Sequence, residues 1–552
     1  METKAPLRPR FILLALGLGA VPGLASAALG QDILQPWDLG LSAVILLAAL
    51  LLASNRLSPA FQAAEIRIPF FLVFIIALVP TAFLDLVSIA TVTNDERAYL
   101  MQAELFTDGE LSEPLASSPA SAWALNRRQV LEIPPRKTAE GFQAGKRYPK
   151  YSPGTGLGLV PGTFLGWPWL SVALMAVFDL LLLAAIGKKL SLGHRTLAPL
   201  LLATSPFFLL VHTSFQSEVF TLPAALLGWL ALLHTRSPHA SKVWPLLLGA
   251  SAGWIFLCRP LTGVLFAFAA LPGLWVGPLA SKLRGTAGAI LGGLPFLALA
   301  LAYNVAQTGD FFLSPYEVYA ENFGPWNVDG TPRDVYGNGD VWEGLLRQMG
   351  RWSVTFFSML GGIGLGLWGL WRHRRVDGGS GFSFALLLPV AYAFHWYPGH
   401  WGYLGPLYAF ESLGVLLVGA LLLLADAPPV WRRSLILASV SFGLISFNLR
   451  LPALTVEQMH RSAPQRAAEV AETGSVVLLP WVNQPALREK GVKLSTPDRP
   501  PFSDQRVVII RENPTPEATR KALVELGLQD RKVYRFVPDS TLSGSLTEID
   551  IP

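Results

Sequence analysis

The chain contains a single cysteine, Cys258, among its 552 residues, which excludes an intrachain disulfide. Charge is also scarce, because Asp, Glu, Lys and Arg make up 15% of the residues while hydrophobic residues make up 52%. Soluble globular proteins carry about 25% charged residues, and the mean hydropathy of this chain is positive. The composition therefore excludes an ordinary soluble protein and indicates a chain that crosses a membrane many times.

The positive charge of the chain does not indicate nucleic-acid binding. The net charge is +5 and the isoelectric point is about 9.2, but the basic residues are scattered in short clusters between apolar runs. Membrane topology produces this distribution. The first apolar run follows Lys4, Arg8 and Arg10 and ends near "ASA" at 25–27. This resembles a signal peptide, but further apolar runs follow, so we expect an uncleaved first helix.

Apolar runs of nearly 20 residues predict thirteen membrane spans, since a helix needs about 20 residues to cross the hydrocarbon core. The predicted spans are 11–30, 37–54, 68–90, 167–187, 196–212, 219–234, 243–258, 262–280, 286–304, 353–371, 381–396, 404–425 and 434–448.

The connecting loops predict the orientation of these spans. With the N-terminus in the cytoplasm, the inner loops carry Lys and Arg while the short outer connections have almost none, with Arg259 as the exception, as the positive-inside rule predicts. The basic residues of the inner loops are Arg56, Arg67, Lys188, Lys189, Arg195, Arg236, Lys242, Lys282, Arg284, Arg372, Arg374, Arg375, Arg432 and Arg433. Three long segments, 91–166, 305–352 and 449–552, then lie outside, so we expect chemistry at the outer face, where nucleotide-sugars are not normally available.

The chain divides into three predicted domains. Residues 1–67 form an N-terminal two-helix membrane hairpin, and residues 68–448 form a transmembrane module with outer loops 91–166 and 305–352. Residues 449–552 read as a small extracytoplasmic α/β domain. "GSVVLLPW", "RVVIIRE" and "RKVYRFV" predict strands, and "PTPEATRKALVELGL" predicts a helix with Thr515 as N-cap, Pro516 at its first position and Gly527 as its stop. The fold class is therefore an all-α polytopic membrane protein with this added domain.

Two adjacent carboxylates, Asp95 and Glu96, follow directly after a predicted span, in "TNDERAYL". Thr93 and Glu96 have the spacing of a capping box, which explains Glu96 as the start of a helix. A capping box does not explain Asp95. The pair could also supply a general base at the membrane surface.

A basic and aromatic stretch, "GKRYPKYSPGTGLGLVPGTFLGW" at 145–167, leads toward the next span. Lys146, Arg147 and Lys150 cluster there beside Tyr151, and ammonium and guanidinium groups bind phosphate strongly. The cluster is suited to a lipid phosphate. Ordinary attraction to anionic headgroups explains it equally well.

Glu218 and Arg259 are charged residues at the predicted outer ends of spans. Glu218 lies in "FQSEVF" with apolar surroundings, where ionisable groups are often functional, although a solvated carboxylate is the alternative. Arg259 lies in "LCRPLTG" at the outer turn of a helical hairpin, against the positive-inside trend. It is either an anion ligand or an arginine whose head reaches the interface.

The remaining candidates lie in two later outer segments. Tyr316, Tyr319, Trp326 and Trp342 could stack on sugar faces, and Arg347 and Arg351, four residues apart, could clamp a phosphate or anchor the loop at the interface. In "HWYPGHWGYLGPLYAFESLG" at 395–414 an aromatic belt explains Trp and Tyr but not Glu411. His395 and His400 lack the spacing of a zinc site, and no segment has metal-ligand spacing.

Together these motifs resemble GT-C-type glycosyltransferases, which include protein O-mannosyltransferases and lipid A aminoarabinose transferases. The acidic pair followed by "YPKYSPGTGLGLVPGTFLG" is similar to their "acidic pair … Y-P-P-G-x-P" opening, and "FQSEVF" to their second acidic site. "GWIFLCRPLTG" resembles their "G-L-x-x-L-x-R-P-x-G" hairpin and "GYLGPLYAFESLG" their late "G-P-R-Y-L-x-x-x-L-P" element. The resemblance spans roughly residues 68–425, and two departures are the spread-out "YPKYSPG" and Leu407, where the late element usually has Arg.

The resemblance implies a sugar donor linked to a polyprenyl phosphate and an inverting transfer to a glycan, lipid or protein at the outer leaflet of a bacterial inner membrane. Asp95 would be the general base, with Glu96 orienting it, binding a cation or only capping. Lys146, Arg147, Lys150, Tyr151, Glu218, Arg259, Arg347, Arg351, His400 and Glu411 would bind the substrate or its phosphate, and a divalent cation such as Mg or Mn could assist. The alternatives are a transporter or flippase for lipid-linked glycan, with Asp179 as its main charged residue in a span, and a catalytically inactive relative.

Overall fold

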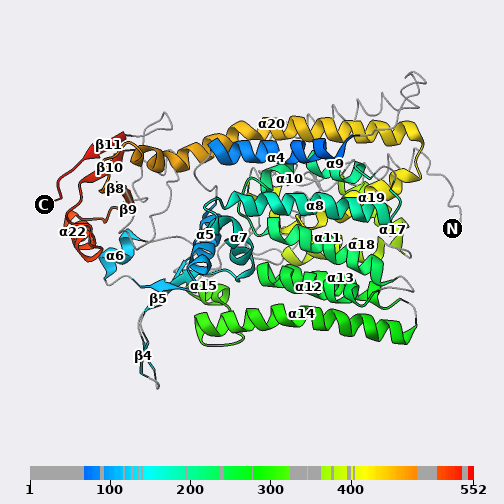
Figure 1. Cartoon of the computed structure of the whole chain (residues 1–552), viewed down its shortest axis with the longest axis horizontal. Coiled ribbons are helices and arrows are strands. Elements are labelled where there is room, and N and C mark those ends of the chain that lie inside the picture. Colours follow the sequence, from blue (N-terminus) through cyan, green and yellow to red (C-terminus); the bar gives the residue numbers. More distant parts are fainter. Residues whose placement is uncertain are drawn as a thin grey trace.

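A computed structural model of the chain describes residues 68–87, 93–115, 118–125, 130–133, 136–138, 141–143, 145–192, 195–236, 241–276, 278–323, 345, 362–374, 378–393, 400–401, 405–480, 507–537 and 545–551. Its main body is a bundle of roughly parallel and antiparallel helices (Figure 1). These helices are α4 (Phe70–Val87), α8 (Trp169–Lys189), α9 (Leu197–Ala203), α10 (Pro206–Val211), α11 (Glu218–Thr235), α12 (Val243–Cys258), α13 (Pro260–Leu274), α14 (Leu279–Thr308), α17 (Gly362–Arg372), α18 (Gly379–Tyr392), α19 (Ser412–Ala425) and α20 (Pro429–Ala468).

Four helices in the described part of the chain are long and apolar enough to cross a membrane. They are α8, α11, α14 and the part of α20 from Pro429 to Pro452. Shorter apolar helices accompany them at Phe70–Ala82, Val243–Cys258, Pro260–Leu274, Gly379–Tyr392 and Ser412–Ala425. These helices agree with an integral membrane protein. The predicted spans 11–30 and 37–54, the domain 1–67 and the first residues of span 353–371 lie outside the described residues.

Two predicted spans differ from the observed helices for local reasons. The span predicted at 196–212 is divided into α9 and α10 at Thr204 and Ser205, because Pro206 has no N–H to continue a helix and Ser205 caps the new one by accepting from Phe208 N. The span predicted at 434–448 is the middle of α20, a helix of 40 residues. At 1.5 Å per residue its length is about 60 Å, so it reaches well beyond a bilayer core.

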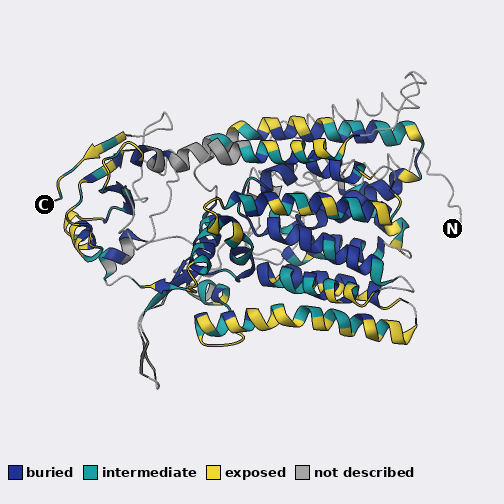
Figure 2. Ribbon diagram, viewed as in Figure 1, coloured by how far each residue is buried: buried dark blue, intermediate teal, exposed yellow. Residues whose placement is uncertain are grey.

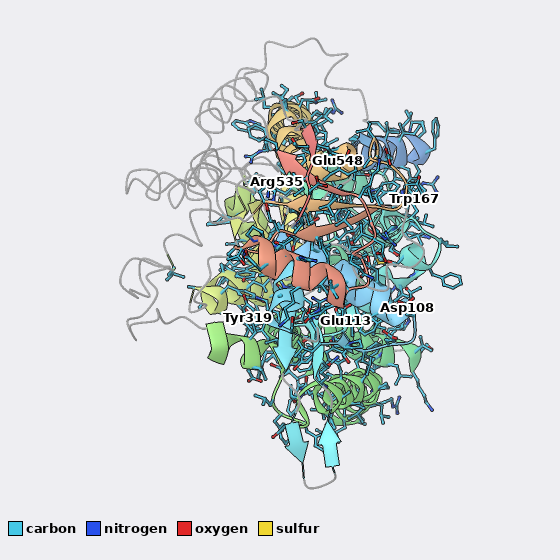
Figure 3. All side chains as sticks on the ribbon, turned by 90° about the vertical axis from the view of Figure 1, so that its left-hand side faces the viewer. Asp108, Glu113, Trp167, Tyr319, Arg535 and Glu548 are labelled. Atoms are coloured by element: carbon cyan, nitrogen blue, oxygen red, sulfur yellow. The ribbon has the colours of Figure 1, made fainter. Side chains whose placement is uncertain are left out.

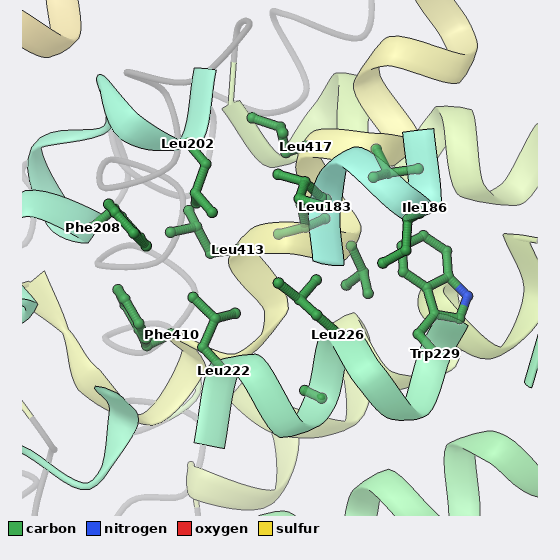
Figure 4. Packing of buried hydrophobic residues seen from close by; sticks show 14 of the residues in the cluster. Leu183, Ile186, Leu202, Phe208, Leu222, Leu226, Trp229, Phe410, Leu413 and Leu417 are labelled. Carbon is green, nitrogen blue, oxygen red and sulfur yellow. The ribbon is translucent and has the colours of Figure 1, made fainter. Parts of the chain in front are cut away.

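The interior of the bundle is one apolar cluster. Figure 4 shows part of it, where Leu222, Leu226 and Trp229 of α11 meet Leu413 and Leu417 of α19 and Leu183 and Ile186 of α8. The surface is also apolar along α14, where Leu283, Ile290 and Leu291 are 58, 58 and 61% exposed. The yellow and teal ribbon of α14 in Figure 2 marks this exposed face, which is suited to contact with lipid tails.

Smaller elements cover the end of the bundle at the left of Figure 1. These include α5 (Asn94–Thr107), α7 (Gly154–Phe164), α15 (Pro315–Phe323) and an antiparallel sheet with strand order β1-β5-β2. Its strands are β1 (Glu113–Pro114), β5 (Lys146–Pro149) and β2 (Val130–Ile133), while β3 (Arg136–Thr138) and β4 (Gly141–Gln143) form a separate hairpin. The strands β6 (His400–Trp401) and β7 (Gly405–Pro406) and the turn η2 (Leu407–Ala409) precede α19.

A second sheet lies beyond α20. Three of its strands and its helix fall in segments predicted from the sequence, whereas its fourth strand was not predicted. Its order is β11-β10-β8-β9, with β8 (Ser475–Leu479) parallel to β9 (Val507–Arg511) and β10 (Val533–Val537), and β11 (Ser545–Glu548) antiparallel to β10. The helix α22 (Pro516–Glu525) has Thr515 as N-cap, accepting from Ala518 N, and Gly527 follows it at φ +69. One face of the sheet packs on α22 and α6 (Pro119–Ala124), and the other on the last turns of α20.

Candidate functional site

The candidate residues gather at one end of the bundle because several helices start or stop there. Glu218 begins α11, Arg259 joins α12 to α13, and Glu411 is the N-cap of α19. All three side chains are buried. The elements α5, α7 and α15 lie over this same end (Figure 1).

Asp95 and Glu96 occupy the first turn of α5, and the capping box expected from the sequence is present. Glu96 Oε1 accepts from Thr93 N at 2.8 Å, and Thr93 Oγ1 accepts from Glu96 N at 3.1 Å. Glu96 Oε2 accepts from Phe215 N at 3.1 Å, and Gln216 Nε2 donates to Thr93 Oγ1 at 2.7 Å. Glu96 therefore holds the start of α5 against the loop that precedes Glu218, while the half-buried Asp95 is not used by this cap.

Lys150 is the basic side chain that faces Asp95. It follows β5 directly and is only 4% exposed. Its Nζ lies 5.0, 4.8 and 4.1 Å from the ring centroids of Tyr151, Tyr316 and Tyr319. Burial lowers the pKa of the Lys150 ammonium from 10.5 to about 8, while the Asp95 carboxylate opposes that change. We call Lys150 and these three tyrosines the lysine cage, and Figure 3 views the molecule from this end with Tyr319 labelled.

Further tyrosines extend the cage along the site. The rings of Tyr99 and Tyr151 are 4.5 Å apart, and those of Tyr392 and Tyr408 stack at 4.2 Å. Burial raises the pKa of the Tyr99, Tyr151 and Tyr408 hydroxyls, and the Asp95 charge adds to the rise in each case. Asp95 is therefore within electrostatic reach of all three, so these residues border one region.

Arg259 is held by two carboxylates in what we call the arginine cluster. Its Nη1 donates to Glu218 Oε1 at 2.6 Å and to Glu411 Oε1 at 3.0 Å. The guanidinium also lies over the rings of Tyr408 and Tyr392, at 5.1 and 5.4 Å from their centroids. With two carboxylates for one guanidinium, the positive charge of Arg259 is already compensated inside the protein.

Leu407 stands where the resembled motif has arginine, and Arg259 supplies a guanidinium at this place. Arg259 Nη1 donates to the Leu407 carbonyl oxygen at 3.2 Å. The cation comes from the turn between α12 and α13 rather than from η2. A guanidinium therefore lies beside Leu407, although Glu218 and Glu411 already compensate its charge.

Hydroxyl groups complete the arginine cluster. Ser217 Oγ donates to Glu218 Oε2 at 3.0 Å, and Thr221 Oγ1 donates to Glu411 Oε1 at 2.8 Å. In the described part of the chain, Glu411 Oε2 is buried with no hydrogen-bond partner. The two glutamates are thus fixed by Arg259 and by hydroxyls of α11 and the residue before it.

Arg147 and Lys146, the other two basic residues of this stretch, bind other parts of the protein. Arg147 is 1% exposed, forms an ion pair with Glu113 of β1 and donates from Nη1 to the Leu125 carbonyl oxygen at 2.8 Å. Lys146 Nζ donates to the Ala306 carbonyl oxygen of α14 at 2.6 Å. Of the three basic residues, the structure brings only Lys150 to Asp95.

Five candidates cannot be placed at the side-chain level. Arg347 and Arg351 lie outside the described residues, as do Trp326 and Trp342. The backbone of His400 lies in β6, paired with Pro406 of β7, while its side chain is outside the described part.

The sequence analysis did not single out Tyr99, Tyr392 or Tyr408. A signal was present for two of them. Tyr99 lies four residues after Asp95 on α5, which places both on one helix face, and Tyr408 lies three residues before Glu411. Tyr392 ends α18 and has no such relation in the sequence to the other residues.

No group of three or more His, Cys, Asp or Glu side chains that could hold a metal ion is found within the described residues. The arginine cluster has two carboxylates, and Oε1 of each, in Glu218 and Glu411, is bound to Arg259. The steps proposed below therefore use the side chains of the chain itself.

No family model matches the chain, and no curated protein sequence is similar to it. Its structural neighbours are GT-C-type enzymes, the group that the sequence motifs resemble.

Two particular neighbours cover most of the chain. ArnT from Cupriavidus metallidurans, in a crystal structure bound to undecaprenyl phosphate, matches with a TM-score of 0.49 and 14% identity, over 84% of this chain and 92% of that chain. The Archaeoglobus fulgidus oligosaccharyltransferase in its apo form matches with a TM-score of 0.42 and 12% identity, over 85% of this chain and 69% of that chain. Sequence identities and TM-scores of this size do not show a shared function.

Proposed function

We propose that this protein transfers a sugar from a polyprenyl-phosphate-linked donor to a glycan, lipid or protein acceptor at the outer face of a bacterial inner membrane. The observation that carries the proposal is the pairing of Asp95 with the buried Lys150 inside a tyrosine-lined region at one end of an apolar bundle. A donor anchored in the bilayer can reach such a site by lateral diffusion. The N-terminus would then be cytoplasmic and residues 449–552 extracytoplasmic.

In this proposal Asp95 is the general base. It takes the proton of the acceptor hydroxyl or amine while the acceptor atom bonds to the anomeric carbon. The bond from that carbon to the phosphate oxygen breaks, and its electron pair leaves with the lipid phosphate. Direct displacement of this kind inverts the anomeric centre.

Lys150 stabilises the leaving group. A buried ammonium attracts the negative charge that develops on the phosphate, and the attraction is strong because little water screens it. The tyrosine rings of the lysine cage also provide flat apolar faces, and their hydroxyls provide donors and acceptors for sugar. The arginine cluster would bind the donor through its fixed carboxylates and the compensated Arg259.

A second function, transport of a lipid-linked glycan, is favoured by one observation. Asp179 in α8 and His212 after α10 are both fully buried, with His212 Nε2 3.2 Å from Asp179 Oδ2, and ionisable residues inside a membrane bundle often mark pathways. The two groups bind one another and His212 Nδ1 is 2.8 Å from the Phe208 carbonyl oxygen. This contact network fits a structural pair, so sugar transfer remains our proposal.

Asp95→Asn tests the enzyme. The asparagine keeps the shape of the side chain but cannot take a proton, so transfer of labelled sugar from a panel of polyprenyl-phosphate sugars by the purified protein should fall by about 10²–10⁴-fold. Asp108→Asn is the matched control, because Asp108 is an exposed residue at the other end of α5.

Full activity of Asp95→Asn would contradict the role of the carboxylate. Absence of transfer by the unchanged protein with every donor would contradict the enzyme itself, and glycan movement across vesicles in that case would favour the transporter.

A further inference from the structure

The short helix α6 belongs to the packing of the second sheet, although it is part of the outer loop far earlier in the chain. Ala124 and Leu125 are buried in the same cluster as Val476, Ile510 and Ala522. Asn513 Nδ2 donates to the Ala120 carbonyl oxygen at 3.2 Å, and Ser118 Oγ donates to the Glu525 carboxylate. Any movement of the sheet relative to the bundle therefore acts on residues 118–125.

Arg147 connects the end of this segment to β5. Leu125 accepts from Arg147 Nη1 at 2.8 Å, and the same guanidinium is bound by Glu113 of β1, with both side chains almost fully buried. Such a buried, doubly bound arginine has little freedom, because losing either partner leaves a charge without compensation. Arg147 thus fixes β5 with respect to α6.

Lys150 follows β5 after Tyr148 and Pro149, whose side chains are buried in the same sheet region. Only two residues separate Arg147 from Lys150. Both pair with β2, while β1 pairs with Lys146 and Arg147 on the other side of β5. A displacement of Arg147 is therefore transmitted to the ammonium in the lysine cage. On the other side of Lys150, Gln102 Nε2 donates a hydrogen bond to the Tyr151 carbonyl oxygen at 3.0 Å.

We propose that Arg147 is a positioning residue. The sheet β11-β10-β8-β9 packs against α6, and Arg147 links α6 to β5. Through this link the sheet determines the position of Lys150. The effect on donor binding rests on the proposed function, in which Lys150 binds the lipid phosphate. The mechanical link from the sheet to β5 does not depend on that function.

The first test replaces the buried pair in the full chain as Glu113→Gln with Arg147→Met, so that neither partner is left as an isolated buried charge. The matched control is Asp426→Asn with Arg372→Met, because this partly exposed Arg–carboxylate pair joins the end of α17 to the end of α19 and lies outside the proposed link. The dissociation constant of undecaprenyl phosphate, measured with the purified protein, should rise about tenfold or more in the first variant and stay unchanged in the control. Lys150→Met should lose binding.

The second test is hydrogen exchange of the amides of residues 146–151. Exchange should become faster in the Glu113→Gln, Arg147→Met variant and also when α6 is released by Asn513→Ala with Glu525→Ala. Unchanged protection of α11, the most buried of the four long apolar helices, shows that the bundle is folded in both variants.

Unchanged exchange at 146–151 in both variants overturns the proposal, as does unchanged affinity for undecaprenyl phosphate in the first variant when Lys150→Met loses it. If the unchanged protein binds no undecaprenyl phosphate while exchange rises as expected, the proposed function fails and the positioning link stands.

Discussion

Asp95 and Glu96 are neighbours in the chain but have different surroundings at the start of α5. Glu96 is 1% exposed and its two oxygens accept from the backbone of Thr93 and Phe215. Asp95 is half-buried and lies within electrostatic reach of Lys150 and Tyr151. Glu96 therefore stabilises the start of the helix, whereas Asp95 is the general base of our proposal.

If Lys150 binds the donor phosphate as proposed, donor binding should depend on pH. Its pKa of about 8 lies below the ordinary 10.5, so raising the pH from 7 to 9 converts most of the ammonium to neutral amine. Because the amine does not attract phosphate, the dissociation constant of undecaprenyl phosphate should rise about tenfold over this range. Equilibrium binding at a series of pH values measures it.

Lys150→Arg is the control for this prediction, since a guanidinium stays charged at all these pH values. Its affinity should be nearly constant from pH 7 to 9. A rise of the same size in both proteins would assign the pH dependence to another group.

At the scale of the elements, close approach of helices depends on glycine. A Cβ on Gly249 of α12 would lie 1.8 Å from the Ala289 carbonyl oxygen of α14, and a Cβ on Gly292 of α14 would lie 2.0 Å from the Leu246 carbonyl oxygen. In a membrane, where lipid tails are as apolar as leucine, such small-residue contacts let backbones approach and gain packing energy. The same holds for α17 and α19, where a Cβ on Gly369 would lie 1.7 Å from the Gly419 carbonyl oxygen.

Gly249→Ala should therefore push α12 and α14 apart and lower the free energy of unfolding by about 1–3 kcal/mol. Gly187→Ala is the matched control in a helix, because its Cβ would meet only the Ala198 Cβ at 3.9 Å. Alanine there should be neutral or stabilising by up to about 1 kcal/mol. Thermal unfolding in detergent compares the two, and equal midpoints would contradict the close packing of α12 on α14.

For the whole molecule, the lysine cage, the arginine cluster and the second sheet all lie toward one end of the bundle (Figure 1). The basic Lys188, Lys189, Arg236 and Arg284 are at or near the opposite ends of their helices. A bundle with this distribution is expected to insert with its basic end in the cytoplasm. The proposed site then opens to the outer leaflet.

Cysteine labelling tests this orientation. In a Cys258→Ala background, which removes the only native cysteine, Lys532→Cys should react with a membrane-impermeant maleimide in intact spheroplasts, because Lys532 is exposed beside β10. Arg284→Cys, exposed near the start of α14, should react only after permeabilisation. Labelling with the opposite pattern would contradict a site at the outer leaflet.

The sequence by itself determined features that depend on near neighbours in the chain. The apolar runs, the capping box of Thr93 and Glu96, the Arg259 turn between two helices and the helix between Thr515 and Gly527 all follow from local hydrogen bonding, propensity and periodicity. Ser205 and Pro206 also cause the helix break within 196–212 locally. The sequence predicts one span there because the segment is apolar throughout.

Only the tertiary structure decided which charged groups meet. Lys146, Arg147 and Lys150 look alike in the sequence, yet Arg147 binds Glu113 and only Lys150 reaches Asp95. Likewise Arg259 and the Leu407 carbonyl, or α6 and the second sheet, come together over separations of more than a hundred residues. Such pairings follow from how buried surfaces pack and from the cost of leaving a buried charge without a partner, and neither is visible in local periodicity.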